Sequence, residues 1–361
     1  MSQFKRDIDK DSLREFIKQT GSAVSAGFNC AISVLGDRLG LFRAMAGGEP
    51  VTSEGLARQL DLHERWVREW LYHQACVGQV NFDEDAGTFH LSPEAEAVLV
   101  DSGHPAYLMG AYDSALAVGP AVPRLEEAFR TGLGMSYDEH GPSCACGIER
   151  MGAFAKQHRL VPEMIPLIRG LHAKLEAGAA VADVGCGGAL STIAMAQAFP
   201  QSEFIGYDTS EHALDRARGN VQEIGLANVR LANPFDEPLP KTSTFDLVTT
   251  FDVIHDTPYP AGLIADIHSA LKDDGHWLCE DIKGYDTFPE NLREHPMAGL
   301  LYGFSVTVCM NSAMSTADGA GLGTLGFTTA VAKQMTSAAG FSQFTQLELD
   351  SPLNNYYAMA K

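Results

Sequence analysis

The chain has 361 residues, and its 46 acidic and 26 basic side chains give a formal charge of -20 at neutral pH. A chain longer than one typical domain predicts two compact units. Because an acidic surface repels phosphate backbones and anionic lipid, we expect neither a nucleic-acid partner nor a membrane partner.

The first residues of the chain, MSQFKRDIDK, are charged, and no run of apolar residues is long enough to span a bilayer. The seven cysteines are odd in number and scattered, with no secretory signal, which favours reduced thiols over a disulfide framework. Together these features predict a cytoplasmic protein.

The region 13–100 shows apolar residues at helical spacing, followed by a hairpin pattern. Short helices are predicted over 51–62 and 63–78, and two strand-like runs then flank an Asp-Ala-Gly turn. Ser92-Pro93 opens a further helix. This order predicts a winged helix. Its apolar and Trp positions exceed what one winged helix can bury, so we expect a homodimer formed through this region.

Strand-like and helical segments alternate from residue 179 onward, which predicts a mostly parallel α/β sheet that is doubly wound and Rossmann-like. Ligands of such sheets bind at the carboxyl ends of the strands. The strands are expected over 179–186, 203–208, 229–233, 244–253 and 276–282.

A glycine-rich turn follows the first of these strands in the run VADVGCGGAL, residues 181–190. Gly185, Gly187 and Gly188 leave the backbone amides open to a polar ligand. Such a turn also suits a dinucleotide site or a plain packing turn, so a second feature must decide. Asp208 is that feature, because an acid ending the next strand, about 20 residues on, accepts the hydroxyls of a ribose.

These motifs carry a family resemblance. Residues 179–285 resemble a class I methyltransferase that uses S-adenosylmethionine: ADVGCGGA is similar to its first motif, GYDTS to its ribose site and FDLVTTFDVIHD to its fourth motif. Ala189 stands where the family has a third glycine, and Asn233 where many members have Asp. An acid before the glycines also suits a cationic amino group. The cofactor-binding residues implied are Asp183, Gly185, Gly187, Asp208, Asn233, Phe235 and Phe251.

The pair His255-Asp256 resembles the His-Asp of small-molecule O-methyltransferases, whose N-terminal domain is a dimerising winged helix. The resemblance implies that His255 removes a hydroxyl proton while Asp256, or another acid, holds its ring. Imidazole suits this work because its ordinary pKa lies near neutrality. A His that merely caps the following helix is the alternative. The Trp that often follows the pair is Thr257 here.

The remaining pocket residues are expected from two segments. The stretch 290–327 has the aromatic, Met and Gly content of a pocket wall, and 136–147 has the composition of a closing segment. No metal is expected, because the spacing of His140, Cys144 and Cys146 matches no common zinc pattern. The candidate substrate-binding residues are Tyr137, His140, Tyr302 and Met310.

The sequence therefore predicts three regions. They are a winged-helix dimerisation domain over 1–100, a helical connector and lid over 101–175, and an S-adenosylmethionine-binding methyltransferase domain over 176–361. The expected activity is methyl transfer to a small-molecule hydroxyl.

Two other functions stay open. A thioether or amine acceptor needs only alignment, so an S- or N-methyltransferase of a small metabolite is one alternative. A non-catalytic S-adenosylmethionine-binding regulator is the other. DNA recognition is disfavoured, because Arg65 and Arg68 of the would-be recognition helix are offset by Glu64 and Glu69.

Overall fold

The structure, a computed structural model, describes residues 7–361, and it divides into two compact units, Met1–Leu116 and Ala117–Lys361. The helix that joins them, α6 (Met109–Thr131), begins in the first unit and ends in the second. Within residues 7–361 no helix combines the length and the apolar character needed to cross a membrane. The three-region division expected from the sequence stays a prediction.

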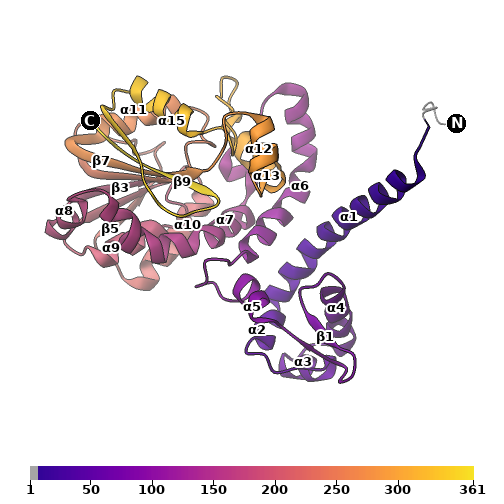
Figure 1. Cartoon of the computed structure of the whole chain (residues 1–361). Coiled ribbons are helices and arrows are strands. Elements are labelled where there is room, and N and C mark those ends of the chain that lie inside the picture. The colour runs from indigo at the N-terminus through magenta and orange to yellow at the C-terminus, as the bar shows by residue number, and fades with distance from the viewer. Residues whose placement is uncertain (1–6) are drawn as a thin grey trace. The chain divides into compact units, whose positions relative to one another are not determined.

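The first unit has the element order of a winged helix (Figure 1). Polar caps start its helices: Thr52 accepts a hydrogen bond from Gly55 N–H at 3.1 Å, and Ser92 accepts one from Ala95 N–H at 3.2 Å. The elements are α1 (Lys10–Arg38), α2 (Leu41–Met45), α3 (Ser53–Gln59), α4 (Glu64–Cys76), β1 (Asn81–Asp83), β2 (Thr88–His90) and α5 (Pro93–Leu99).

The carboxyl-terminal part of α1 packs against α4. The indole Nε1 of Trp70 donates to the carbonyl oxygen of Ile32 at 3.0 Å, and a Cβ added at Gly36 would lie 2.5 Å from the Trp70 ring. The amino-terminal part of α1 leaves large apolar side chains exposed, among them Phe16 and Phe28. In Figure 1 this part of the helix runs out from the rest of the first unit.

Helical segments precede the sheet of the second unit, and further helices follow it. Before the sheet come η1 (Tyr137–His140), α7 (Pro142–Phe154), the π-helix η2 (Ala155–Met164), η3 (Ile165–Leu167) and α8 (Leu171–Ala177). After its fifth strand come α12 (Phe288–Glu294), α13 (Ala298–Phe304), the π-helix η4 (Ser305–Cys309), α14 (Met310–Ala313) and α15 (Thr329–Ala338).

Seven strands form the sheet in the order β5-β4-β3-β6-β7-β9-β8, and all neighbours from β5 to β7 are parallel. Strand β9 is antiparallel to both of its neighbours. The strands and the helices between them are β3 (Ala180–Val184), α9 (Leu190–Ala198), β4 (Glu203–Tyr207), α10 (Glu211–Ile224), β5 (Val229–Ala232), β6 (Phe245–Phe251), α11 (Pro260–Ala270), β7 (Leu271–Ile282), β8 (Gln343–Gln346) and β9 (Asn354–Ala360).

The strand order reverses between β3 and β6, because the chain leaves β3 toward β4 and β5 and returns to pair β6 on the other side. Connections at such a point diverge, so a crevice opens at the carboxyl ends of these two strands. Figure 1 shows α11 and α15 on one face of the sheet, with α8, α9 and α10 on the other. Separate apolar clusters fill the two interfaces.

The fifth strand is longer than its apolar pattern predicts. Strand β7 starts at Leu271, which pairs with Phe245, and its register then shifts before His276 pairs with Leu247. The irregular part of β7 around Gly275 lies against the backbone of β6, since a Cβ there would be 2.9 Å from the carbonyl oxygen of Phe245. A bulge of this kind hides the start of a strand from an alternation pattern.

We predict that Gly36→Ala destabilises the first unit, because the new methyl group meets the rigid Trp70 ring. Overpacking of this kind costs roughly 1 to 3 kcal/mol. Thermal melting followed by tryptophan fluorescence measures the change. Gly21→Ala on the same helix is the control, because no atom lies within 4 Å of its added Cβ. Equal effects of the two changes would contradict the packing argument.

Candidate active site

The glycine-rich turn follows β3 at the switch point. Gly185 has a φ of 73° and its added Cβ would collide with Val253, so only glycine fits there. Gly187 has a φ of 56° and open space where a Cβ would lie. Ala189 holds a left-handed φ of 63°, a conformation that costs an L-residue about 1 to 2 kcal/mol. The turn therefore presents bare backbone on the side of Gly187.

Asp208 follows β4 and is held by two backbone donors. Gly187 N–H donates to its Oδ2 at 2.8 Å, and Ser210 N–H donates to its Oδ1 at 2.9 Å. Burial raises the pKa of Asp208, and these two donors oppose the rise. A carboxylate has about four lone-pair positions, so each oxygen keeps one for a further donor. The arrangement matches what a vicinal diol needs.

Asp183 is the last residue but one of β3 and is 1% exposed. Its Oδ2 accepts from the hydroxyls of Ser191 and Thr192, both at 2.6 Å, and its Oδ1 accepts from the hydroxyl of Thr249 at 2.8 Å. The carboxylate thus joins β3 to the start of α9 and to β6. The predicted contact of Asp183 with a cationic amino group stays a prediction. Its three hydrogen bonds show that it holds β3, α9 and β6 in position.

Gly188 lies beneath helix α7. A Cβ at this position would collide with the carboxylate of Glu149, and the same carboxylate pairs with Arg216 of α10 at 2.6 Å. The next helical segment back contributes Asp138, whose Oδ1 accepts from the hydroxyl of Ser210 at 2.7 Å. The hydrogen bond of Asp138 and the ion pair of Glu149 therefore hold η1 and α7 against α10, beside the glycine-rich turn.

The other predicted cofactor residues lie at the ends of β5 and β6. Asn233 forms a turn: its Nδ2 donates to Glu211 at 2.7 Å, and its Oδ1 accepts from Phe235 N–H at 3.1 Å. The ring of Phe235 is 81% exposed, while Phe251 is buried at the end of β6. Phe235 is therefore free to cover an apolar ligand face, and the Asn233 amide already has partners.

His255 forms a pair with Asp281 of β7. The distance from His255 Nδ1 to Asp281 Oδ1 is 2.6 Å, and the two side chains are fully enclosed. Burial lowers the pKa of His255, but the negative charge of Asp281, the charge of Cys309 and the hydrogen bond to Asp281 together outweigh burial and hold that pKa well above its usual value. A hydrogen bond between the ring and Cys309 adds to the rise.

The acid that holds the ring is thus Asp281, and the sequence prediction had named Asp256 or another acid. Asp256 has no side-chain hydrogen bond among residues 7–361. Burial raises its pKa to about 7, with His255 opposing and neighbouring acids adding to the rise. The only feature of the sequence that points to Asp281 is the pair of acids, Glu280 and Asp281, in the otherwise apolar run HWLCEDI.

The predicted substrate residues divide into two groups. Burial raises the pKa of Tyr137 well above its usual value, and the ionisable groups of Cys144 and Asp256 add to the rise, so Tyr137 lies near the His255 region. His140 Nε2 lies 3.3 Å from the hydroxyl of Ser312 in α14. Met310 begins α14, directly after Cys309. Tyr302 contacts the ring of Phe288, at 5.8 Å between centroids.

Cys144 is buried, and burial raises the pKa of its thiol to about 12, so it stays protonated. Within residues 7–361 no group of three or more His, Cys, Asp or Glu side chains is arranged to hold a metal ion. The substrate roles of all four predicted residues stay predictions.

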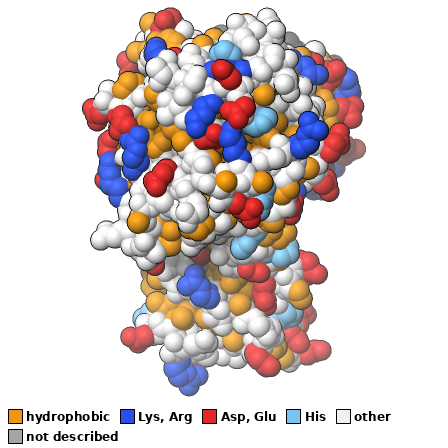
Figure 2. Space-filling model, turned by 90° about the vertical axis from the view of Figure 1, so that its left-hand side faces the viewer, with side chains coloured by type: hydrophobic (Ala, Val, Ile, Leu, Met, Phe, Trp, Pro, Cys, Tyr) orange, Lys and Arg blue, Asp and Glu red, His pale blue; other side chains and the backbone are white. Residues whose placement is uncertain are grey.

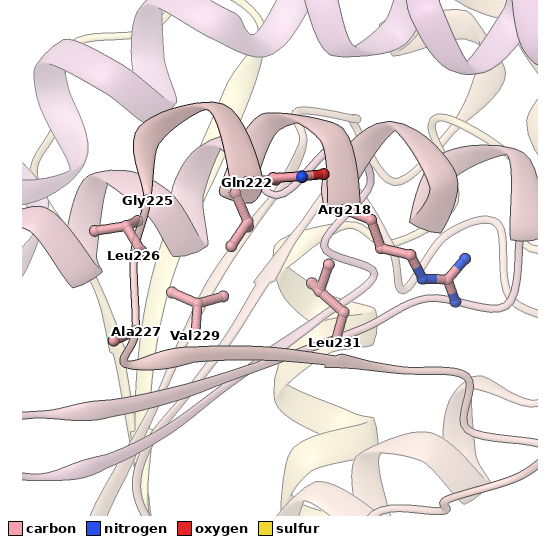
Figure 3. A pocket seen from close by; sticks show the side chains of 8 residues that line it. Arg218, Gln222, Gly225, Leu226, Ala227, Val229 and Leu231 are labelled. Carbon is pink, nitrogen blue, oxygen red and sulfur yellow. The ribbon is translucent and has the colours of Figure 1, made fainter.

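Two surface features lie apart from these residues. A hollow of about 520 Å³ lies between α10 and β5, and Figure 3 shows Gln222, Val229 and Leu231 around it. None of the predicted site residues lines it. On the face drawn in Figure 2, acidic and basic side chains are interspersed, so this face carries no continuous basic patch.

Comparison with known families identifies two regions of the chain. Residues 175–337 match the family described as a methyltransferase domain, and residues 26–101 match the Rv2258c-like winged HTH domain. The chain therefore combines a methyltransferase domain of the S-adenosylmethionine-dependent type with an N-terminal winged-helix domain. This confirms the expected class, fold and cofactor.

Relatives by sequence cover only part of the chain. The mitochondrial ubiquinone biosynthesis O-methyltransferase of Candida albicans is 32% identical over 100 residues, which are 27% of this chain and 30% of that protein. The ubiquinone biosynthesis O-methyltransferase of Nitrosococcus oceani is 31% identical over 134 residues, 35% of this chain and 52% of that protein. The chain therefore spans about a third to a half of these relatives.

Solved structures resemble the whole chain. A putative O-methyltransferase from Nostoc punctiforme has 21% identity and a TM-score of 0.70, covering 98% of this chain and all of the other. Human N-acetylserotonin methyltransferase, solved in complex with S-adenosylmethionine, has 13% identity and a TM-score of 0.66, covering 99% of each chain. At these identities the likeness shows a shared fold.

We predict that Asp183→Ala lowers the free energy of unfolding by roughly 3 kcal/mol or more, because three buried hydroxyls lose their acceptor and each loss costs about 1 to 3 kcal/mol. Urea unfolding followed by circular dichroism measures it. Asp215→Ala, which removes an exposed acid of α10, is the control and should change little. An unchanged urea midpoint for Asp183→Ala would mean that the carboxylate does not hold these elements together.

Proposed function

We propose that the chain transfers the methyl group of S-adenosylmethionine to a hydroxyl of a small molecule, with His255 as the general base. The observation that carries this proposal is the enclosed His255–Asp281 pair at 2.6 Å, beside the carboxyl ends of β6 and β7. An imidazole oriented by a carboxylate is the arrangement that a general base needs.

The residues present fit the cofactor. Asp208 keeps an acceptor position on each oxygen for the ribose hydroxyls, and the turn around Gly187 leaves room for close approach. Phe235 offers an exposed apolar ring for the adenine. S-adenosylmethionine, when bound, supplies an electrophilic methyl group on a sulfonium.

His255 takes the acceptor proton on Nε2. Its Nδ1 faces Asp281, so Nδ1 carries the hydrogen of that bond and Nε2 is the basic atom. Asp281 keeps the ring in this tautomer and stabilises the positive charge that forms on it. General-base help of this kind contributes about 10²- to 10⁴-fold. Alignment of the two reactants by the enclosing segments contributes the larger share, roughly 7 kcal/mol or more.

The raised pKa of His255 gives the reaction a pH dependence. Below that pKa the ring is protonated and unable to accept a proton, so turnover of a hydroxyl acceptor falls as the pH falls. The ring regains its basic form as the pH rises through the same value. Both relatives by sequence described above are O-methyltransferases, which supports the choice of a hydroxyl acceptor.

We predict that His255→Ala loses about 10²- to 10⁴-fold in turnover of a phenol or alcohol acceptor, with nearly unchanged cofactor affinity. The loss should shrink as the pH rises, because hydroxide replaces the base. Asp281→Asn should move the rising limb of the pH profile to lower pH, since it removes the charge that raises the His255 pKa. Release of S-adenosylhomocysteine from a panel of phenols, thiols, thioethers and amines provides the measurement.

Asp256→Asn is the matched comparison, because Asp256 makes no side-chain hydrogen bond and should shift the profile less than Asp281→Asn does. Near-normal turnover of His255→Ala from about pH 6 to about pH 9 would remove the base and favour alignment-only transfer to sulfur or nitrogen.

We also propose that a second copy of the chain covers the amino-terminal part of α1. Four large apolar side chains of this part are more than half exposed. The buried residues of α1 begin only at Asn29. A helix with this much unburied apolar surface gains stability by association. The exposed set is Phe16, Ile17, Val24 and Phe28.

The double change Phe16→Glu with Phe28→Glu should convert a dimer into a monomer in sedimentation velocity at micromolar concentration. The negative charges would be desolvated in a paired interface, which is unfavourable. Glu54→Gln on α3, an exposed position of the same unit, is the control and should leave the dimer intact. A wild-type chain that sediments as a fully active monomer would rule the dimer out.

A further inference from the structure

The carboxyl groups of Asp252 and Glu280 lie at the carboxyl ends of the adjacent strands β6 and β7, and Asp256 follows in the loop after β6, where burial, aided by the charge of Asp252, raises its pKa. We name these three residues the acidic cluster. Asp252 directly follows β6, and Glu280 pairs in register with Phe251, the last residue of that strand. The backbone N–H of Asp252 donates to the carbonyl oxygen of Glu280 at 2.9 Å. The cluster therefore lies at the ends of two adjacent strands and in the loop after β6, at the ligand-binding edge of the sheet.

The cluster has few partners of its own. Glu280 is 5% exposed, and its Oε2 has no hydrogen-bond partner. Asp256 has no side-chain hydrogen bond among residues 7–361. Asp252 accepts one, from Asn354 Nδ2 at 2.9 Å. A buried acceptor without a donor is unfavourable, so a hydrogen-bond donor or a cation next to Glu280 would stabilise its carboxylate.

The surrounding charges leave the cluster negative. His255 is already paired with Asp281, and Arg159 of η2 is bound to Glu163 and to the carbonyl oxygen of Asp350. Lys156, also on η2, lies 6.0 Å from the centroid of the Phe251 ring, and its charge lowers the pKa values of Asp252 and Glu280. One such ammonium does not balance three carboxyls.

Burial and mutual repulsion act on the cluster in the same direction. Burial, followed by the charge of Asp281, raises the pKa of Asp252 to about 6. Burial, followed by the charge of Asp252, raises the pKa of Glu280 to about 8. Tyr356 of β9 also faces Glu280, and burial raises the pKa of its phenol, so it stays neutral. A positive charge placed here relieves this repulsion.

The backbone supports a built arrangement. Asp252 has a φ of 59°, in the left-handed region that a residue with a side chain rarely adopts. Such strain persists only where the surroundings hold it, and it is concentrated at ligand sites. Here the bonds to Glu280 and Asn354 hold Asp252 in that conformation.

We infer that the acidic cluster makes the protein prefer S-adenosylmethionine to S-adenosylhomocysteine, by attracting the sulfonium charge that the product lacks. The inference rests on the proposed function. The two molecules share the adenosine and the amino-acid end and differ by one methyl group and one positive charge. Contacts to the shared parts therefore stabilise both bound molecules equally. Only a group that responds to the positive charge makes the two affinities differ. After transfer the attraction is lost, which favours product release.

The size of the effect follows from the charge alone. Two unit charges about 10 Å apart at an effective dielectric constant of about 20 interact strongly enough for roughly a tenfold difference in affinity. The bound cation also favours the ionised carboxyls, so protons leave the cluster for the buffer when S-adenosylmethionine binds. The neutral thioether exerts no such pull.

The test is calorimetry of the full chain with each of the two ligands, at neutral pH, in buffers of different ionisation enthalpy. We expect Glu280→Gln and Asp252→Asn each to weaken S-adenosylmethionine by roughly tenfold relative to S-adenosylhomocysteine. Asparagine tolerates the left-handed backbone at 252, so the second variant keeps the fold. Proton release should accompany the first ligand alone and should shrink in both variants.

Two further variants fix the interpretation. Glu203→Gln removes one exposed acid at the opposite end of β4 and should leave the ratio of affinities unchanged. Lys156→Met removes a positive charge and should increase the preference, the opposite direction from Glu280→Gln. An unaltered ratio in both cluster variants, or equal weakening of both ligands, would overturn the inference. A wild-type chain that binds neither ligand would overturn the proposed function instead.

Discussion

The geometry of the site depends on a single buried carboxylate, that of Asp183. Asp183 accepts hydroxyl hydrogen bonds from the start of α9 and from β6, so it sets the distance between the glycine-rich turn and the strand that leads to His255. The sheet alone does not fix that distance, because connections diverge at the switch point. With the turn and β6 held together, Asp208 and His255 lie at the same edge of the sheet.

Much of this organisation can be predicted from local patterns. Alternating strands and helices, the glycines after β3 and the acid after β4 each follow from residue types at short spacing, and the fold and family agree with them. The winged helix followed in the same way from its capping residues and its hairpin turn. These signals are local because caps and tight turns depend on a few neighbouring residues.

The side-chain partners were harder to predict, because they join distant positions. His255 and Asp281 are 26 residues apart, and nothing in a linear pattern distinguishes Asp281 from its neighbour Glu280 until the register of β6 and β7 is known. One residue along a strand moves a side chain to the opposite face. Asp281 therefore reaches the imidazole, while Glu280 lies toward η2 with Lys156 and Arg159.

The glycine at position 188 shows how a motif can extend beyond its own letters. Its backbone is not left-handed, so the turn itself would accept a side chain there, yet the carboxylate of Glu149 occupies the space. Glycine is required at this position by helix α7, held to α10 through Arg216, and not by the turn. The glycine-rich turn and helix α7 above it must therefore match each other. A chimaera that receives the glycine-rich motif of a relative packs well only when the residue at position 149 is exchanged together with the motif.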